Sequence, residues 1–261
     1  MGFVRGTVRR LLLGLMQHVP GRVWQSGFRL WLDMQRNREP ATALVSLFQL
    51  QGLLDGAMDR NAIRYEGGVH PKHRLMRYHD FFVQRLRPGE RVLDIGSGHG
   101  AVAYSMAAAG AQVTAVEIDG KLVAFARGRY RHENLRFVHL DALAYVSPEP
   151  VDTVVLSNVL EHMDHRVVFL RQVQQRMSPA RWLIRLPLAT RDWRVPLCGE
   201  LGLSTYNDPD HRLEYTPTAL AGELAAAGLH LTHLESAWGE LWAEAKEETS
   251  DGIDDQAGRG V

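Results

Sequence analysis

Hydrophobic and polar positions follow two different patterns on either side of residue 90. Before it, apolar residues recur every three or four positions, as on one face of a helix. This spacing predicts a helix over 4–15 and a second around Trp24–Trp31 that ends before Pro40. It predicts further helices over about 41–54 and 73–86. We therefore expect a helical N-terminal region over residues 1–72, followed by a second domain over 73–248.

After residue 90, short runs rich in β-branched residues alternate with helical segments. The predicted strands are 91–95, 112–117, 135–138, 151–157, 182–186, 229–234 and 241–246. The predicted helices between them are 101–109, 121–131, 167–177 and one that begins with the cap Thr216-Pro217 and ends at Gly228. This alternation predicts an α/β fold, a doubly wound parallel sheet with helices on both faces. The turn Trp238-Gly239 joins the last two strands as an antiparallel hairpin.

Charge is balanced overall but uneven along the chain. Thirty basic and thirty acidic side chains among 261 residues give a formal net charge of zero, so we expect no nucleic-acid partner, which would favour a basic excess. Residues 1–40 carry seven arginines against Asp33 and Glu39, and residues 238–261 carry a net charge of −5. We expect the basic helices to form a cap over a substrate site, a homodimer surface or a peripheral membrane contact. An arginine-rich start is also typical of a transit peptide.

The composition points to a location and to the end of the ordered chain. The single cysteine, Cys198, excludes an internal disulfide and fits a reducing compartment. We expect a cytoplasmic protein, with membrane contact limited to the periphery. Residues 249–261 are rich in Gly and Asp and are predicted to be disordered.

A glycine-rich turn follows the first predicted strand. The segment Asp94-Ile95-Gly96-Ser97-Gly98-His99-Gly100 places glycines on alternate positions between a strand and a helix. Glycine there permits a tight turn and a close approach of the backbone to a ligand. A plain strand–helix turn is the simpler alternative for this segment alone.

Two further acids strengthen the case for a ligand. Glu117 ends the second predicted strand and Asp141 follows the third. The carboxyl ends of parallel strands meet at one edge of the sheet, so these acids and Asp94 converge on the crevice where open α/β sheets bind ligands. Glu117 suits the two hydroxyls of a ribose, and we expect it to face solvent and ligand rather than the core.

The ligand has two candidates. Gly96, Gly98 and Ala101 satisfy the G-x-G-x-x-A pattern of a dinucleotide-binding dehydrogenase, with Glu117 as the ribose acid. Asp94 argues against it, because a pyrophosphate favours N–H donors rather than a nearby carboxylate. S-adenosylmethionine has no phosphate and carries an ammonium group, which Asp94 suits.

These segments together resemble the class I S-adenosylmethionine-dependent methyltransferases. Residues 92–100 look like their first motif, 115–119 the second, 137–142 the third, 151–162 the fourth and 177–179 the fifth, although Ala180-Arg181 stands where the family often has glycines. The resemblance covers roughly residues 75–246. It implies a Rossmann-like sheet of seven strands with an antiparallel last strand, and S-adenosylmethionine as the cofactor.

The resemblance also implies roles for individual residues. It places Gly96, Ser97, Gly98 and Gly100 beside the methionine part of the cofactor, and Asp94 near its ammonium group. It places Glu117 on the ribose, Ile118 on the adenine face, and Asp141 with the Ala142 backbone at the adenine amino group. Ser157 and Asn158, which end the fourth strand, lie next to the sulfonium.

Two histidines are candidates for acceptor chemistry. A hydroxyl acceptor needs a base near its proton, most often a histidine or a carboxylate. His162 follows the fourth strand, and His211 precedes the capped helix in a connection, 187–215, that is long enough to be functional. Each has a simpler alternative, His162 as a helix-start hydrogen-bonding group and His211 as a solvated loop residue. We predict no metal site, since His70 and His73 flank Pro71.

The sequence predicts a methyltransferase that acts on a small-molecule acceptor, most often at a hydroxyl group. The alternatives are a catalytically silent cofactor-binding protein of this fold that serves as a partner or scaffold, and an NAD-dependent dehydrogenase. The acceptor is open among sugars, lipid-linked intermediates, quinones and secondary metabolites.

Overall fold

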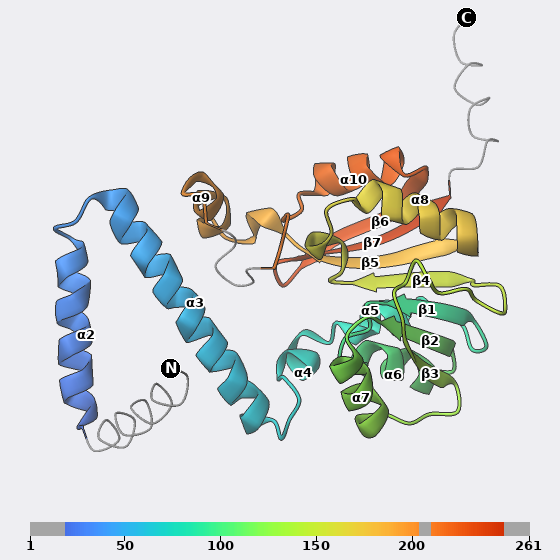
Figure 1. Ribbon diagram of the computed structural model, residues 1–261, viewed down its shortest axis with the longest axis horizontal. Coiled ribbons are helices and arrows are strands. Elements are labelled where there is room, and N and C mark those ends of the chain that lie inside the picture. The colour runs from blue at the N-terminus through green and yellow to red at the C-terminus, as the bar shows by residue number, and fades with distance from the viewer. Residues whose placement is uncertain (1–18, 204–209, 248–261) are drawn as a thin grey trace, which may run out of the picture. The chain divides into compact units, whose positions relative to one another are not determined.

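The computed structural model describes residues 19–203 and 210–247 (Figure 1). The helix predicted over 4–15 and the tail predicted over 249–261 lie outside the described residues. The chain divides into two compact units, 1–53 and 54–261. The expected domain boundary at residues 72 and 73 stays a prediction.

Two helices dominate the part of the chain before residue 66. They are α2 (Gly21–Gln35) and α3 (Pro40–Tyr65), and α3 crosses the boundary between the units. The Glu39 carboxylate caps α3 by accepting hydrogen bonds from the N–H groups of Ala41 and Thr42 at 2.9 and 2.8 Å. The prediction that this helix ends near residue 54 is wrong: the helix continues through Gly52 and Gly56, because no proline interrupts it before Gly67-Gly68.

Helix α2 leaves large apolar side chains exposed. Trp24 and Phe28 are each 43% exposed, and Phe28 stacks on Trp31 with ring centroids 6.0 Å apart. Exposed apolar residues of this kind are compatible with the predicted membrane contact or dimer surface, and both stay predictions. Among the described residues, no helix is long and apolar enough to span a bilayer.

The helix predicted over 73–86 is divided into two short helices. These are α4 (Lys72–Met76) and α5 (His79–Val83). Arg77 between them adopts a left-handed conformation, with φ 49°, and a residue in that conformation cannot continue a right-handed helix. Tyr78, the next residue, is buried. The break therefore corrects the prediction of one continuous helix.

Seven strands form one sheet in the order β3-β2-β1-β4-β5-β7-β6. Their bounds are β1 (Arg91–Ile95), β2 (Gln112–Glu117), β3 (Leu135–His139), β4 (Thr153–Ser157), β5 (Arg181–Pro187), β6 (Leu229–Ala237) and β7 (Glu240–Glu247). Strands β1 to β5 pair in parallel, whereas β7 pairs antiparallel with both β5 and β6. The predicted doubly wound sheet with an antiparallel end is confirmed.

Helices cover both faces of this sheet and bury two apolar clusters. In Figure 1, α8 (Arg166–Met177) and α10 (Pro217–Ala226) lie over one face, where their leucines pack against β4 and β5. On the other face, α5, α6 (Ala101–Ala108) and α7 (Gly120–Arg129) pack against β1, β2 and β5. The predicted cap of α10 is confirmed, because the Thr216 hydroxyl accepts the Ala219 N–H at 3.1 Å.

The long connection between β5 and α10 contains short helices rather than open loop alone. They are η2 (Ala189–Arg191) and α9 (Arg194–Glu200). Leu188 and Tyr215 form an isolated β-bridge that draws the two ends of the connection together. The residues just after β5 and just before α10 are thereby held beside the end of the sheet.

The two apolar clusters predict that two tryptophans contribute very differently to the free energy of unfolding. Trp182 on β5 is fully buried, and its indole N–H donates to the Gln174 side-chain oxygen at 3.0 Å. Trp182→Ala should lower the free energy of unfolding by about 3–5 kcal/mol, through lost burial and the cavity left behind. Trp238→Ala is the matched control: this side chain is 67% exposed, and its loss should cost about 0.5 kcal/mol or less. Urea titration measures both, and equal losses would contradict the assignment of the core.

Candidate functional site

The predicted glycine turn borders a cavity of about 600 Å³ at the carboxyl ends of β1 and β4. Strand order reverses between these two strands, and such a switch point is where open α/β sheets bind ligands. Seven of the predicted cofactor residues line the cavity: Asp94, Gly96, Ser97, Gly98, Gly100, Ser157 and Asn158. The structure thus brings together two segments about 60 residues apart in sequence, as the motifs predicted.

The turn after β1 requires glycine at two positions. Gly96 and Gly100 have φ of +67° and +81°, a region that side chains with a Cβ rarely adopt. A Cβ at Gly100 would lie 2.7 Å from the Phe137 ring, and one at Gly96 would lie 2.8 Å from Val159. The glycines therefore let the turn pack directly against β3 and the segment after β4.

Three buried polar groups around this cavity have no hydrogen-bond partner. They are Asp94 Oδ2, Ser97 Oγ and Asn158 Oδ1. Burial raises the pKa of Asp94 to about 8, and the nearby Glu117 carboxylate adds to the rise. Buried polar atoms in native proteins are almost always paired, so a group of three around one cavity indicates a polar ligand that includes a cationic donor.

Glu117 lies beside the cavity but is turned toward the chain. Its two carboxylate oxygens accept the N–H groups of Gly98 and Asp119, each at 2.9 Å. The side chain is only 8% exposed, so the expectation that it faces solvent is wrong. One N–H donor from the glycine turn, that of Gly98, and the N–H of Asp119 hold the carboxylate in this buried position. Because a carboxylate has about four lone-pair sites, each oxygen keeps capacity for one more donor.

The remaining predicted cofactor residues lie at the same edge of the sheet but do not line the cavity. Ile118 is 67% exposed directly after β2. Asp141 is exposed two residues after β3, and its Oδ1 accepts the Leu143 N–H at 2.7 Å. Ala142 is partly buried beside it. A flat aromatic ligand group extending from the cavity would meet an exposed apolar side chain and an exposed carboxylate here.

The two predicted catalytic histidines meet beyond the end of β4. His162 belongs to the short helix η1 (Leu160–His162), and its ring contacts the His211 ring edge-on with centroids 4.8 Å apart. The Arg212 N–H donates to the Glu161 carbonyl oxygen at 2.7 Å, which ties the His211 segment to η1. His162 is exposed, whereas the His211 side chain is 9% exposed.

A carboxylate network holds His211. Its Nδ1 lies 2.9 Å from Glu214 Oε1, and Glu214 also forms an ion pair with Arg191. A carboxylate beside Nδ1 favours the tautomer that carries its proton there and its lone pair on Nε2. His211 and Arg191 together keep the pKa of Glu214 below its usual value despite burial, which alone raises it.

Sequence reasoning missed three charged residues in this region. Glu161 is fully buried, both of its carboxylate oxygens have no hydrogen-bond partner, and burial raises its pKa to about 7. Glu214 orients His211, and Arg185 lines the cavity from β5. The available signals were a carboxylate directly before His162, another three residues after His211, and a charge inside the apolar run of β5.

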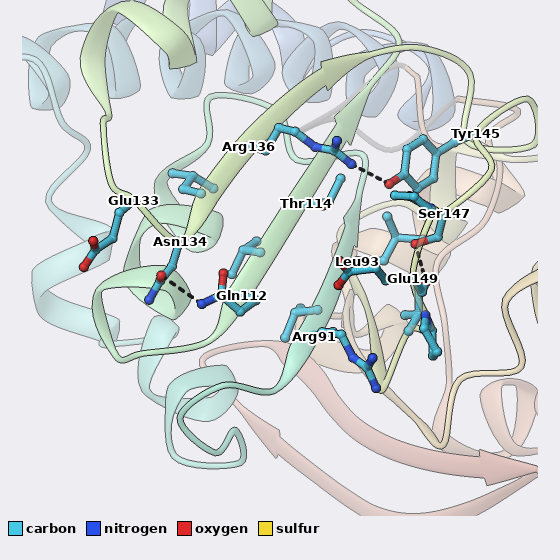
Figure 2. Close-up of a pocket in the computed structure, with 16 residues that line it drawn as sticks. Arg91, Leu93, Gln112, Thr114, Glu133, Asn134, Arg136, Tyr145, Ser147 and Glu149 are labelled. Atoms are coloured by element: carbon cyan, nitrogen blue, oxygen red, sulfur yellow. Dashed lines mark hydrogen bonds between the residues drawn. The ribbon is translucent and has the colours of Figure 1, made fainter.

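A second pocket of about 230 Å³ lies at the opposite edge of the sheet, where β1, β2 and β3 begin. Figure 2 shows hydrogen bonds between several of the residues that line it. Gln112 donates to Asn134 and Arg136 donates to the Tyr145 hydroxyl, each at 2.9 Å. These paired groups contrast with the unpartnered atoms at the carboxyl edge, which is the candidate site.

Comparison with known proteins points to the same chemistry. A family model described as a methyltransferase domain matches residues 68–234, more than half of the chain. A ubiquinone biosynthesis O-methyltransferase of Albidiferax ferrireducens is 30% identical over 125 residues, which are 45% of this chain and 50% of that protein. The chain thus spans about half the length of the curated relatives it matches.

Solved structures share the fold. Magnesium protoporphyrin IX methyltransferase from Synechocystis PCC 6803, crystallised with bound SAH, matches with a TM-score of 0.53 and 19% identity over 66% of this chain and 82% of that chain. Mitomycin 7-O-methyltransferase matches with a TM-score of 0.53 and 19% identity over 66% of this chain and 53% of that chain.

The family match covers the parallel strands β1 to β5, the glycine turn and the histidine of η1, and it agrees with the strand order and with the unpartnered groups around the cavity. The chain therefore belongs to the methyltransferase-domain family, within the class I superfamily of enzymes that use S-adenosylmethionine.

Proposed function

We propose that this enzyme methylates a hydroxyl group of a small molecule. The observation that carries the proposal is the short path from cofactor to base. Asn158 in the cavity wall is followed within four residues by Glu161 and His162, and His211 packs against His162. The names of the relatives support oxygen as the acceptor atom, because ubiquinone biosynthesis and mitomycin enzymes among them are O-methyltransferases.

The cavity residues fit S-adenosylmethionine. The buried Asp94 carboxyl, with an unpartnered oxygen, suits the ammonium group of the methionine part, and Ser97 and Asn158 offer further unpartnered buried oxygens. Glu117 has lone pairs for ribose hydroxyls, and the exposed Ile118 offers an apolar face to adenine. Gly96, Gly98 and Gly100 allow the backbone close to the ligand. Asp141 and Ala142 are proposed for the adenine edge, and Ser157 for the sulfonium end.

The chemistry is a direct displacement. When bound, S-adenosylmethionine supplies an electrophilic methyl group on sulfur. The protein's main task is to align the acceptor oxygen with that carbon. A neutral hydroxyl must also lose its proton, and we propose His211 as the principal residue in that activation, with His162 shaping the pocket. Two mechanisms are open to the His211 imidazole: it accepts the proton itself, or it holds a cation that makes the hydroxyl more acidic.

The N-terminal helices keep all three predicted roles as proposals: a cap over a substrate site, a homodimer surface and a peripheral membrane contact. We propose that the basic, aromatic α2 forms a surface contact, at a membrane periphery or in a homodimer. The exposed Trp24 and Phe28 support this proposal, and Arg22 and Arg29 on the same helix suit an anionic surface.

Removing the Glu117 carboxylate should weaken cofactor binding. Glu117→Ala should raise the S-adenosylmethionine dissociation constant by about 10- to 150-fold, corresponding to about 1.5–3 kcal/mol for a charged hydrogen-bond partner. Asp119→Ala, the neighbouring acid that caps α7, is the control and should leave affinity nearly unchanged. Calorimetric titration measures both. An unchanged constant in folded Glu117→Ala would exclude Glu117 from the site.

The raised pKa of Asp94 predicts that the stability of the ligand-free protein depends on pH. Its native pKa of about 8 exceeds the unfolded value of about 3.9, so the native state holds an extra proton between these pH values. The stability of the wild type should therefore fall as pH rises from about 4 to about 8. In Asp94→Asn this fall should be reduced, while S-adenosylmethionine binding is lost.

Denaturant titrations across that pH range test the Asp94 prediction. Asp141→Asn, a change at an exposed carboxylate, should leave the wild-type slope intact. If the curves of Asp94→Asn and the wild type run parallel, the buried carboxyl does not titrate in this window.

Loss of His211 should affect turnover more than binding. His211→Ala should lower the rate of labelled methyl transfer by about 10²–10⁴, the usual contribution of acid–base activation, while cofactor affinity stays within a few-fold. The deficit should shrink for acceptors that are already ionised at the assay pH. His165→Ala, three residues after His162 and exposed, is the control. Near-normal turnover in His211→Ala and His162→Ala would leave positioning alone as the mechanism.

A further inference from the structure

We propose that Glu161, His162 and His211 bind a divalent transition-metal cation of the Zn²⁺ class, which activates the acceptor hydroxyl. Binding of the cation is argued from these residues alone. Its catalytic use rests on the proposed hydroxyl methylation. Sequence analysis predicted no metal site, because Glu161 and His211 are 50 residues apart and their proximity appears only in the folded chain.

The donor atoms already lie close together. One ligand atom from each of the three residues lies within 4.8 Å of the other two. Two donors in a tetrahedral site with bonds of about 2.1 Å are about 3.4 Å apart. Binding therefore requires the most widely separated donors to approach by about 1 Å or more, through rotation of the side chains. The hydrogen bond from Arg212 N–H to the Glu161 carbonyl oxygen holds the two segments in register.

The Glu161 carboxyl is the second, independent observation. It is fully buried, and neither oxygen has a hydrogen-bond partner. A buried carboxylate without a partner is strongly disfavoured, and such groups are normally paired or coordinate metals. Glu161 shares the cluster with two histidines, and histidine ring nitrogens are themselves metal ligands. A cation shared with them would satisfy the Glu161 carboxylate.

The surroundings of His211 match those of a metal-bound histidine. Such a histidine usually donates its other ring N–H to a carboxylate, which fixes the tautomer and the ring orientation. Here Glu214 lies 2.9 Å from Nδ1, and Arg191 in turn holds Glu214. Nε2 is then the nitrogen that carries the lone pair for a cation.

The donor set selects the class of metal. Imidazole nitrogens suit Zn²⁺, Co²⁺ and Fe²⁺, whereas Mg²⁺ and Ca²⁺ favour sites made of oxygen ligands. Three protein ligands leave at least one position open, as in catalytic rather than structural zinc sites. His162 is exposed, so this position is accessible from the acceptor side.

The chemical step balances without an oxidant or reductant. The acceptor oxygen binds at the open position, its acidity rises, and its proton leaves to solvent water. The oxygen lone pair then forms the bond to the methyl carbon. The carbon–sulfur bond breaks, and its electron pair returns to sulfur, which neutralises the sulfonium.

Direct metal binding tests the proposal independently of turnover. Purified full-length protein is dialysed against EDTA and then titrated with Co²⁺ in the visible spectrum and with Zn²⁺ by calorimetry. We expect saturation at about one ion per chain, with d–d bands typical of a tetrahedral or five-coordinate site. Glu161→Gln and His211→Ala should each weaken binding more than 100-fold.

Two further variants distinguish ligand from neighbour. Glu214→Gln should weaken binding about 10- to 100-fold, the usual effect of removing an outer-shell partner. His165→Ala should bind like the wild type. Circular dichroism and thermal melting confirm that each variant is folded. If Glu161→Gln unfolds, His162→Ala serves as the second ligand test, because this exposed side chain contributes little to the core.

The outcomes separate this proposal from the proposed function. Absence of saturable Co²⁺ and Zn²⁺ binding in the wild type, or equal binding in wild type and Glu161→Gln, would overturn the metal site. Full methyl transfer in excess EDTA would overturn its catalytic role and leave His211 as the direct base. Metal binding together with S-adenosylmethionine binding, but no transfer to any hydroxyl acceptor in a metabolite extract, would contradict the proposed function and leave the metal site standing.

Discussion

The reversal of strand order between β1 and β4 is the constraint on which the site depends. Chain segments leave these adjacent parallel strands in opposite directions, so a crevice opens at their carboxyl ends. The glycine turn enters it from β1 and Asn158 enters it from β4, and η1 begins two residues after Asn158. The two segments can both lie there only if they approach each other closely. The contact between Gly96 and Val159 determines how closely they approach. The cofactor cavity and the histidine cluster therefore both follow the carboxyl ends of the central strands.

One buried carboxyl group lies in the cofactor cavity and another lies in the histidine cluster. Asp94 and Glu161 are each at most 1% exposed, and burial raises the pKa of the first to about 8 and of the second to about 7. Neither group contributes to folding as an ordinary ion pair does. Each is a destabilising arrangement in the isolated chain that a positive ligand group would relieve. At both places, the buried carboxyl group lowers the stability of the ligand-free protein, and a positively charged ligand group would restore that stability.

Local sequence predicts the backbone elements of the site but not which of its charged residues are buried. Strand–helix alternation and the glycine turn predict the sheet and the cavity, because periodicity and glycine conformations are local properties. The break at Arg77 has no local signal, since arginine rarely adopts a left-handed conformation. The buried Glu117 carboxylate accepts an N–H from a separate segment, at Gly98, and the backbone of the buried Glu161 is tied to the His211 segment. Contacts between distant segments decide which acids face solvent, and these contacts were the part that sequence could not supply.

Arg185 shows why unpartnered atoms, rather than buried charge as such, identify the ligand-binding groups. It is 4% exposed, nearly as deeply buried as Asp94 and Glu161, and it lines the cofactor cavity. Its guanidinium is nevertheless satisfied: Glu240 on the antiparallel strand β7 forms an ion pair with it, and the Tyr78 ring lies 4.0 Å below it. Such a pair fixes β7 and the segment before β1 to the sheet, and adding a ligand would gain little there. Asp94 and Glu161 lack this compensation within the described residues. The chain therefore pairs the guanidinium that holds its cavity wall and leaves without a partner the two carboxyl groups proposed to meet the cofactor and the cation.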